Sequence, residues 1–135
     1  MILGIGTDIC DIRRIEQSMD KFGERFLDKT FTSAERRYCD AKARPAMGYA
    51  KRFAAKEAVA KAIAGPNTGA LPWLSVEVRN ETSGRPLIKL HGEAKARAES
   101  LISAGQAIRI HLSLSDDYPY ATAFAIAEAV PSVTQ

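Results

Sequence analysis

The sequence predicts an α+β fold, a single domain over residues 1-135 in which antiparallel hairpins pack around a long central helix. Apolar and polar residues alternate with the period of a strand in segments 74–79 and 107–115, which predicts the hairpins. Pro45 opens and Gly65-Pro66 closes a helical stretch over about 46–64, which predicts the central helix. With 135 residues and 46% hydrophobic content, the chain can bury one core.

The first strand is expected over residues 2–9. Gly4, Gly6 and Asp8 share one of its faces, since side chains alternate along a strand. The two glycines allow another backbone or a ligand to approach that face closely. Asp11 is the expected N-cap of a helix of about ten residues. The apolar stripe of this helix comprises Ile12, Ile15, Met19 and Phe22.

The middle of the chain carries further helix and turn signals. Thr32 and Glu35 form a capping box that opens a second helix. Residues 65–72 have the composition of a loop. A hairpin is expected from 74–79 and 87–90, with Ser75, Glu77 and Arg79 on the polar face of its first strand. The alanine-rich segment 92–104 is expected to be helical.

The last hairpin has the clearest pattern. Alternate residues of its first strand are apolar and expected to be buried: Ile108, Ile110, Leu112 and Leu114. One face of the return strand carries only alanine: Ala121, Ala123, Ala125 and Ala127. Such a face permits very close packing, either by a helix or by a neighbouring subunit.

Composition excludes several classes of protein. The net charge of +3 suits an acidic partner or a phosphorylated ligand, or reflects ordinary solubility alone. Cys10 and Cys39 are too few for a disulfide framework or a zinc quartet. The sequence shows no secretory signal, no apolar run of the roughly 20 residues that span a bilayer, and no Walker loop or nucleophile elbow. We expect a soluble cytoplasmic protein without a membrane partner or a covalent protein nucleophile.

Five polar residues are candidates for chemistry, and each has a structural alternative. Asp8 follows an apolar strand and needs a partner, but it could cap the next helix. Glu57 and Lys61 share one helical face, where they could form only a solvated ion pair. His111 on a polar strand face is typical of a surface histidine, and Arg85 is typical of a turn.

Several segments, in this order, resemble the holo-acyl-carrier-protein synthases. They are residues 4–9 (GIGTDI) with Arg14-Ile15, residues 31–35 (FTSAE), residues 52–58 (RFAAKEA) with Lys61, Gly84-Arg85-Pro86, residues 111–115 (HLSLS) and Tyr120-Ala121. The resemblance covers about residues 2–127, and its first and third motifs are highly specific in combination. Asp116 departs from it, because many members have histidine there.

The resemblance implies a small bacterial 4′-phosphopantetheinyl transferase. Such an enzyme moves 4′-phosphopantetheine from coenzyme A to a serine of an acidic apo acyl carrier protein and releases 3′,5′-ADP. It implies Mg²⁺ as cofactor, with Asp8 and Glu57 as ligands and Lys61 near the scissile pyrophosphate. It also implies a homotrimer whose active sites lie between adjacent protomers.

The resemblance further assigns residues to the two substrates. Those implied to hold coenzyme A are Arg52, Lys56, Gly84, Arg85, Pro86, His111 and Ser113. Arg14 and Arg25 are implied to face the acidic carrier protein. Arg13 and Lys21 add basic charge around the first helix, so we expect docking there to depend on salt.

These residue types suit the implied reaction. Mg²⁺ is typically held by one or two carboxylates together with substrate phosphates. Charge builds on the bridging and leaving oxygens as the carrier serine attacks, and Mg²⁺ with Lys61 would stabilise it. The proton acceptor is expected to be Glu57 itself or a Mg²⁺-bound water that it polarises, and the sequence leaves both open.

Two other functions are compatible with the residues alone. Another Mg²⁺-dependent enzyme acting on nucleotide diphosphates would use Asp8, Glu57 and Lys61 equally well. A nucleic-acid-binding module would account for the basic balance, but acidic residues are interleaved and no strand shows base-stacking aromatic pairs. We therefore expect no nucleic-acid partner.

Overall fold

A computed structural model describes residues 1–67 and 69–133 of the chain. Its elements in order are β1 (Ile2–Asp11), α1 (Ile12–Phe22), α2 (Glu24–Thr30), α3 (Ser33–Asp40), α4 (Pro45–Ala62), a 3-10 helix (Trp73–Ser75), β2 (Val76–Asn80), β3 (Pro86–Leu90), α5 (Gly92–Glu99), β4 (Gln106–Asp117) and β5 (Tyr120–Pro131). Within the described residues the strands form two antiparallel sheets, β1-β5-β4 and β2-β3. The predicted α+β architecture is confirmed.

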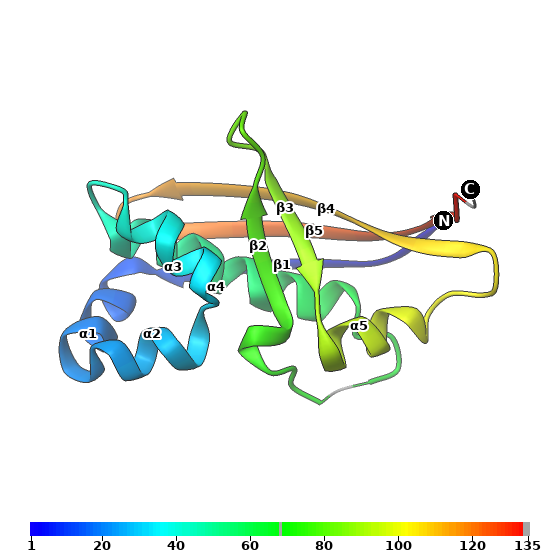
Figure 1. Cartoon of the computed structure of the whole chain (residues 1–135), viewed down its shortest axis with the longest axis horizontal. Coiled ribbons are helices and arrows are strands. Elements are labelled where there is room, and N and C mark those ends of the chain that lie inside the picture. Colours follow the sequence, from blue (N-terminus) through cyan, green and yellow to red (C-terminus); the bar gives the residue numbers. More distant parts are fainter. Residues whose placement is uncertain (68, 134–135) are drawn as a thin grey trace.

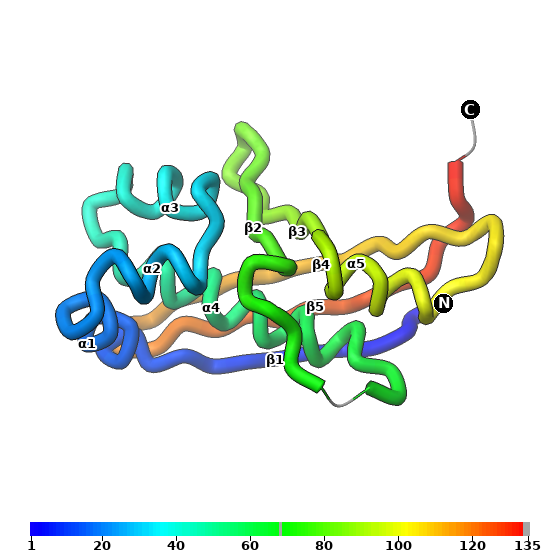
Figure 2. Tube along the Cα trace, turned by 60° about the horizontal axis from the view of Figure 1, so that its bottom comes forward, coloured from blue at the N-terminus to red at the C-terminus, as the bar shows by residue number. Residues whose placement is uncertain are grey.

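The long helix α4 packs on β1 and β5 and also contacts β2. Figure 1 shows β1, β5 and β4 running side by side along the molecule, with the β2–β3 hairpin crossing their direction. In Figure 2, α1, α2 and α3 gather at one end of these strands, while the N-terminus and the loop between α5 and β4 lie at the other. Within the described residues, no helix is long and apolar enough to cross a membrane.

The two glycines of β1 decide how closely α4 approaches the sheet. A Cβ atom on Gly4 would lie 2.0 Å from the carbonyl oxygen of Ala62, and one on Gly6 would lie 1.8 Å from that of Ala58. Neither distance is possible for a side chain, so glycine is required at both positions. Of the two partners expected for this face, a helix backbone is the one present.

The alanine face of β5 lies under the same helix. Its members are nearly or fully buried against α4: Ala121, Ala123, Ala125 and Ala127. A helix therefore covers this face, and a neighbouring subunit cannot. The opposite face of the sheet remains open, with Ile5, Ile9 and Phe124 exposed by 57%, 64% and 45%.

The helix starts follow the predicted capping chemistry. The Asp11 carboxylate accepts a hydrogen bond from the Arg13 amide at 3.0 Å, which caps α1. Thr32 and Glu35 form the reciprocal capping box of α3. Pro45 occupies the first turn of α4, as expected for a residue without an amide hydrogen.

Two predicted elements need correction, and one further helix was not predicted. Residues 74 and 75 lie in a 3-10 helix, so the strand begins only at Val76, and Glu77 is buried rather than on an open polar face. The helix expected over 92–104 ends at Glu99, where the chain turns through Ser100. The short helix α2 was not predicted, because seven residues give too little periodicity. Thr68, in the loop expected over 65–72, lies outside the described residues.

Candidate active site

The close packing of β1 on α4 brings Asp8, Glu57 and Lys61 together, and we call these three residues the acidic site. The Lys61 ammonium lies 3.4 Å from Asp8 Oδ1 and donates a hydrogen bond to the Thr7 carbonyl oxygen at 2.8 Å. Burial raises the pKa of Glu57, the neighbouring Asp8 charge raises it further, and Lys61 partly opposes both. Two distant acids therefore lie close enough to repel each other.

The structure distinguishes between the alternatives for these residues. Asp11, not Asp8, caps the following helix. Among the described residues, Lys61 forms its ion pair with Asp8 across two elements rather than with Glu57 on its own helix. The sequence predicted a shared face for Glu57 and Lys61, and the tertiary contact adds the strand residue.

A second charged group lies in the interior beside α4. Lys56 is 2% exposed, and its ammonium binds Glu35 Oε1 at 2.8 Å, the Trp73 carbonyl oxygen at 2.9 Å and the Val76 carbonyl oxygen. A lysine has three N–H donors, and all three are used here. The contact of Lys56 with coenzyme A stays a prediction, and one of these bonds would have to break to allow it.

The two buried carboxylates beside Lys56 are also well paired. Glu35 accepts hydrogen bonds from the amides of Thr32 and Val78, both at 2.9 Å. Glu77 accepts from Thr32 Oγ1 at 2.6 Å and lies 3.0 Å from His91 Nε2. We call the group of Thr32, Glu35, Lys56, Glu77 and His91 the interior network.

Sequence reasoning missed the role of Glu77 in this network. Although burial raises the pKa of Glu77, hydrogen bonds from Thr32, His91 and Arg79 outweigh it and lower the pKa to about 2. From the alternation along the strand, Glu77 was expected on the polar face together with Ser75 and Arg79. The local sequence holds no sign that α3 covers that face.

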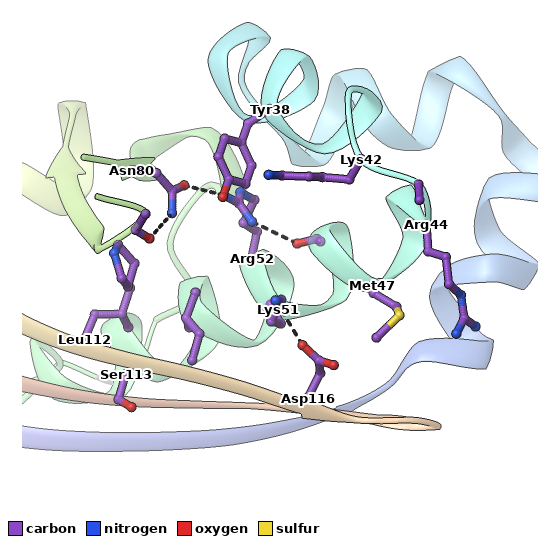
Figure 3. Close-up of a pocket in the computed structure, with 15 residues that line it drawn as sticks. Tyr38, Lys42, Arg44, Met47, Lys51, Arg52, Asn80, Leu112, Ser113 and Asp116 are labelled. Atoms are coloured by element: carbon purple, nitrogen blue, oxygen red, sulfur yellow. Dashed lines mark hydrogen bonds and ion pairs between the residues drawn. The ribbon is translucent and has the colours of Figure 1, made fainter. Parts of the chain in front are cut away.

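A cavity of about 670 Å³ opens on the β4 side of α4 (Figure 3), and we call it the basic cavity. Its cationic lining residues are Lys42, Arg44, Lys51 and Arg52, of which only Arg52 was predicted. Gly84, Pro86 and Ser113, three other predicted residues, also line it. Lys42 and Arg44 were missed because the turn between α3 and α4 carries no motif.

The side chain of Arg52 forms part of the cavity wall. Its guanidinium lies 4.3 Å from the ring centre of Tyr38 and donates hydrogen bonds to the Gly48 carbonyl oxygen and to Asn80 Oδ1. In the described part of the chain its buried Nε has no partner. Lys51 pairs with Asp116 at 3.0 Å, which accounts for the acid at this position.

Two predicted coenzyme A residues lie away from this cavity. His111 projects from the open face of the sheet, where its Nε2 lies 2.9 Å from Glu128 Oε1. Arg85 is exposed in the turn of the β2–β3 hairpin. Neither lines the basic cavity of the same chain, so both assignments stay predictions.

The acidic site and the basic cavity lie on opposite sides of α4. The cavity is bounded by β4 residues such as Leu112 and Asp116, whereas Asp8 belongs to β1. β5 lies between these two strands in the sheet. The helix therefore separates the acidic site from the basic cavity within one chain.

The residues predicted to face a carrier protein lie on α1 and α2. Arg14 and Arg25 are both exposed. Arg14 borders a hollow of about 190 Å³ that Ile15, Phe26 and Phe53 also line. Arg13 is tied to the Asp11 carboxylate by two hydrogen bonds, at 2.9 and 2.8 Å, and so is less available.

Comparisons with known proteins agree over nearly the whole chain. Residues 4–123 match the 4′-phosphopantetheinyl transferase superfamily. A holo-[acyl-carrier-protein] synthase of Methylorubrum populi is 49% identical over 131 residues, which are 97% of this chain and 96% of that protein. The crystal structure of the Neisseria meningitidis synthase superposes with a TM-score of 0.78 and 36% identity, covering 95% of this chain and 99% of that one.

A third similar protein was solved with a ligand. The Bacillus anthracis holo-(acyl-carrier-protein) synthase in complex with CoA (3′,5′-ADP) gives a TM-score of 0.72 at 30% identity. The match covers 94% of this chain and 96% of that chain.

Proposed function

This chain belongs to the holo-[acyl-carrier-protein] synthases of the 4′-phosphopantetheinyl transferase superfamily, and we propose that it transfers 4′-phosphopantetheine from coenzyme A to a serine of an apo acyl carrier protein. The observation that carries the proposal is the 49% identity to a named synthase over 97% of the chain. The geometry supports it, since the chain offers a cationic cavity for the donor and an acidic site for the reaction.

The basic cavity is the proposed site for the 3′,5′-ADP half of coenzyme A. Its lysine and arginine side chains suit the phosphate groups, and Arg52 keeps a buried donor without a partner. A volume of about 670 Å³ is in the usual range for a nucleotide-sized ligand.

The acidic site fits a magnesium ion. Burial and then the neighbouring Asp8 carboxylate raise the pKa of Glu57, and a divalent cation would relieve the repulsion between the two acids. Within the described residues, three or more acidic, histidine or cysteine side chains nowhere gather around a possible metal position. Two carboxylates suit Mg²⁺, which takes its remaining ligands from phosphates and water. Bound there, Mg²⁺ would supply electrostatic stabilisation of the pyrophosphate oxygens.

In the proposed reaction, Glu57 and Lys61 have different roles. The carrier serine Oγ attacks the β-phosphorus and forms a new P–O bond, while the bond to the bridging oxygen breaks. The electron pair leaves with 3′,5′-ADP, and the Glu57 carboxylate is the proposed acceptor of the serine proton. Lys61 lies beside Asp8, where its ammonium can balance the charge that develops.

We propose that the complete active site forms between two copies of the chain, within the homotrimer that the resemblance implies. One copy would supply its acidic site and the next its basic cavity, because α4 separates the two within one copy. The open apolar face that includes Ile5, Ile9 and Phe124 gives the copies a surface to bury. Light scattering that shows only monomers under assay conditions would contradict this arrangement.

Mass spectrometry tests the proposed activity directly. Apo carrier protein incubated with the chain, coenzyme A and Mg²⁺ should gain the mass of one phosphopantetheine, and 3′,5′-ADP should accumulate. Glu57→Gln should abolish the gain, whereas Glu99→Gln, which neutralises an exposed acid on α5, should not. If coenzyme A is hydrolysed without modification of any carrier, an enzyme acting on nucleotide diphosphates becomes the better assignment.

The proposal includes a docking surface for the carrier protein and a location in the cell. Arg14 and Arg25 would dock the acidic carrier protein, supported by the exposure of both side chains and by the position of Arg14 at the hollow that Phe53 lines. A cytoplasmic location would be tested by fractionation of cells that produce the protein.

A further inference from the structure

One side chain joins two walls of the basic cavity. Asn80 is the last residue of β2 and lies opposite Pro86, the first residue of β3. Its side-chain oxygen accepts a hydrogen bond from Arg52 Nη2 on α4, and its side-chain nitrogen donates one to the Gly84 carbonyl oxygen at 3.0 Å. Figure 3 shows Asn80 bonded on both sides in this way. We call these two hydrogen bonds the Asn80 bridge.

The chemistry of the two partners fixes the orientation of the Asn80 amide. A guanidinium only donates hydrogen bonds and a carbonyl oxygen only accepts them, so the Asn80 oxygen faces Arg52 and its nitrogen faces Gly84. An ionised aspartate at this position could not donate to Gly84, and a leucine of similar shape could bond to neither partner. An amide serves both partners at once.

The hairpin turn that follows Asn80 projects beyond the other elements (Figure 1). Two backbone hydrogen bonds close it, from the Glu81 amide to the Arg85 carbonyl oxygen at 2.9 Å and from the Gly84 amide to the Glu81 carbonyl oxygen at 2.8 Å. These bonds set the shape of the turn, but they do not attach it to α4. The Asn80 bridge does attach it, and Gly84 lines the basic cavity.

The same bridge fixes the side chain of Arg52, which is 2% exposed. Nη1 of this arginine donates to the Gly48 carbonyl oxygen at 3.3 Å, and Nη2 donates to Asn80. Among the described residues, only its buried Nε is left without a partner. Loss of the Asn80 oxygen would leave a second buried donor unpaired, and the guanidinium could then turn. The bridge therefore determines which donor of Arg52 remains for an anion.

We propose that Asn80 is a positioning residue for donor binding, which holds the Gly84 turn against Arg52 and so shapes the basic cavity before a ligand arrives. This inference rests on the proposed function, because it takes the basic cavity as the site of the 3′,5′-ADP half of coenzyme A. A preformed site loses less conformational freedom on binding, so the bridge acts on affinity. It does not act on the transfer step, since the acidic site lies on the other side of α4.

Removal of the bridge tests this role. Asn80→Ala should raise the Kd of 3′,5′-ADP, measured by calorimetry, and the KM for coenzyme A on the order of fivefold or more, because two hydrogen bonds are lost and one of them involves a charged group. The kcat at saturating coenzyme A should stay within about twofold of wild type, since binding alone is weakened. An unchanged Kd, or a lowered kcat with an unchanged KM, would overturn the inference.

Gln106→Ala is the matched control. It also removes an amide side chain that bonds to a turn, since Gln106 Oε1 accepts from the Ser103 amide at 2.9 Å, but Gln106 begins β4 and does not line the basic cavity. This variant should leave the Kd and the KM unchanged. Equal losses of affinity in both variants would mean that Asn80 has no special role.

Asn80→Gln separates position from polarity. Glutamine keeps both hydrogen-bonding groups but is one methylene longer, so it cannot make both bonds with the turn in its present place. Binding of 3′,5′-ADP should weaken about threefold, as expected for one hydrogen bond lost or strained. If this variant binds as tightly as wild type does, the spacing is unimportant and the inference is wrong. It also serves as the test if Asn80→Ala does not fold.

The inference and the proposed function fail in different ways. If the wild-type chain binds 3′,5′-ADP and modifies the carrier, but Asn80→Ala binds as tightly as wild type does, only the role of Asn80 is wrong. If the wild-type chain neither binds 3′,5′-ADP nor modifies a carrier, the function itself is wrong.

Discussion

The interior network and the acidic site adjoin the same helix, and each contains a lysine beside carboxylates. In the interior network, Lys56 and Glu35 are 1% and 0% exposed at their side chains, and their charged atoms are matched with partners. In the acidic site, the Lys61 side chain is 53% exposed, and its contact with Asp8 is longer, at 3.4 Å against 2.8 Å. The charged groups of the interior network therefore have close hydrogen-bonding partners, whereas those of the acidic site are paired less completely.

This difference shows how burial divides structural from chemical roles. A charge in the interior is costly unless it is paired and hydrogen-bonded, so breaking the interior network should lower the stability of the folded chain. An acid pair near solvent can remain incompletely paired, because water solvates it. That leaves charge at Asp8 and Glu57 available to a ligand.

The largest expected effect is on stability, when Lys56 and Lys61 are each replaced by methionine. Lys56→Met should lower the free energy of unfolding by about 3–5 kcal/mol, because Glu35 becomes a buried charge without its partner. Lys61→Met should change it by less than about 1 kcal/mol, since this lysine is exposed. Urea denaturation measures both, and equal losses would remove the distinction between the two regions.

The two regions should also respond to pH with opposite signs. The pKa of Glu77 is lowered from 4.5 to about 2, so its ionised form contributes about 3 kcal/mol above pH 4.5, which is lost as the pH falls towards 2. The pKa of Glu57 is raised, so its contribution to stability grows as the pH falls through that raised value.

Unfolding experiments across this pH range separate the two glutamates. Glu77→Gln should be less stable at neutral pH and should show a flatter acid limb than wild type. Glu57→Gln should be at least as stable as wild type at neutral pH, because the repulsion with Asp8 is gone. A steeper acid limb for Glu77→Gln would contradict the assigned hydrogen bonds.

A smaller effect is expected on turnover from the acidic site alone. Lys61→Met should lower kcat about a hundredfold, since it removes one charge from the developing transition state. Lys95→Met, which removes an exposed lysine of α5, should leave kcat unchanged. Steady-state assays with carrier protein and coenzyme A check both, and a change confined to KM would assign Lys61 to binding instead.

The smallest effect should come from a cation that belongs to neither region. Arg14→Glu should raise the KM for the carrier protein about three- to tenfold, with little change in the KM for coenzyme A. The increase should shrink at high salt, because exposed charges are screened. Lys95→Glu serves as the control for a general charge effect, and equal changes in both variants would move the docking surface elsewhere.

Features that arise within a few residues could be predicted from the sequence alone. The caps at Asp11 and Thr32, the start of α4 at Pro45 and the alternation along β4 and β5 depend on local hydrogen bonds and side-chain period. The glycines of β1 indicated a close approach without indicating its partner.

Which charges are buried depends on the packing of distant elements and could not be predicted from the sequence. The local sequence does not distinguish Lys56 from Lys61, and the alternation along the strand predicted that Glu77 faces solvent. Their environments are set by segments far along the chain: Glu35 and Val76 enclose Lys56, whereas β1 leaves Lys61 open. Burial depends on which distant elements pack together, and that information is not present in local periodicity.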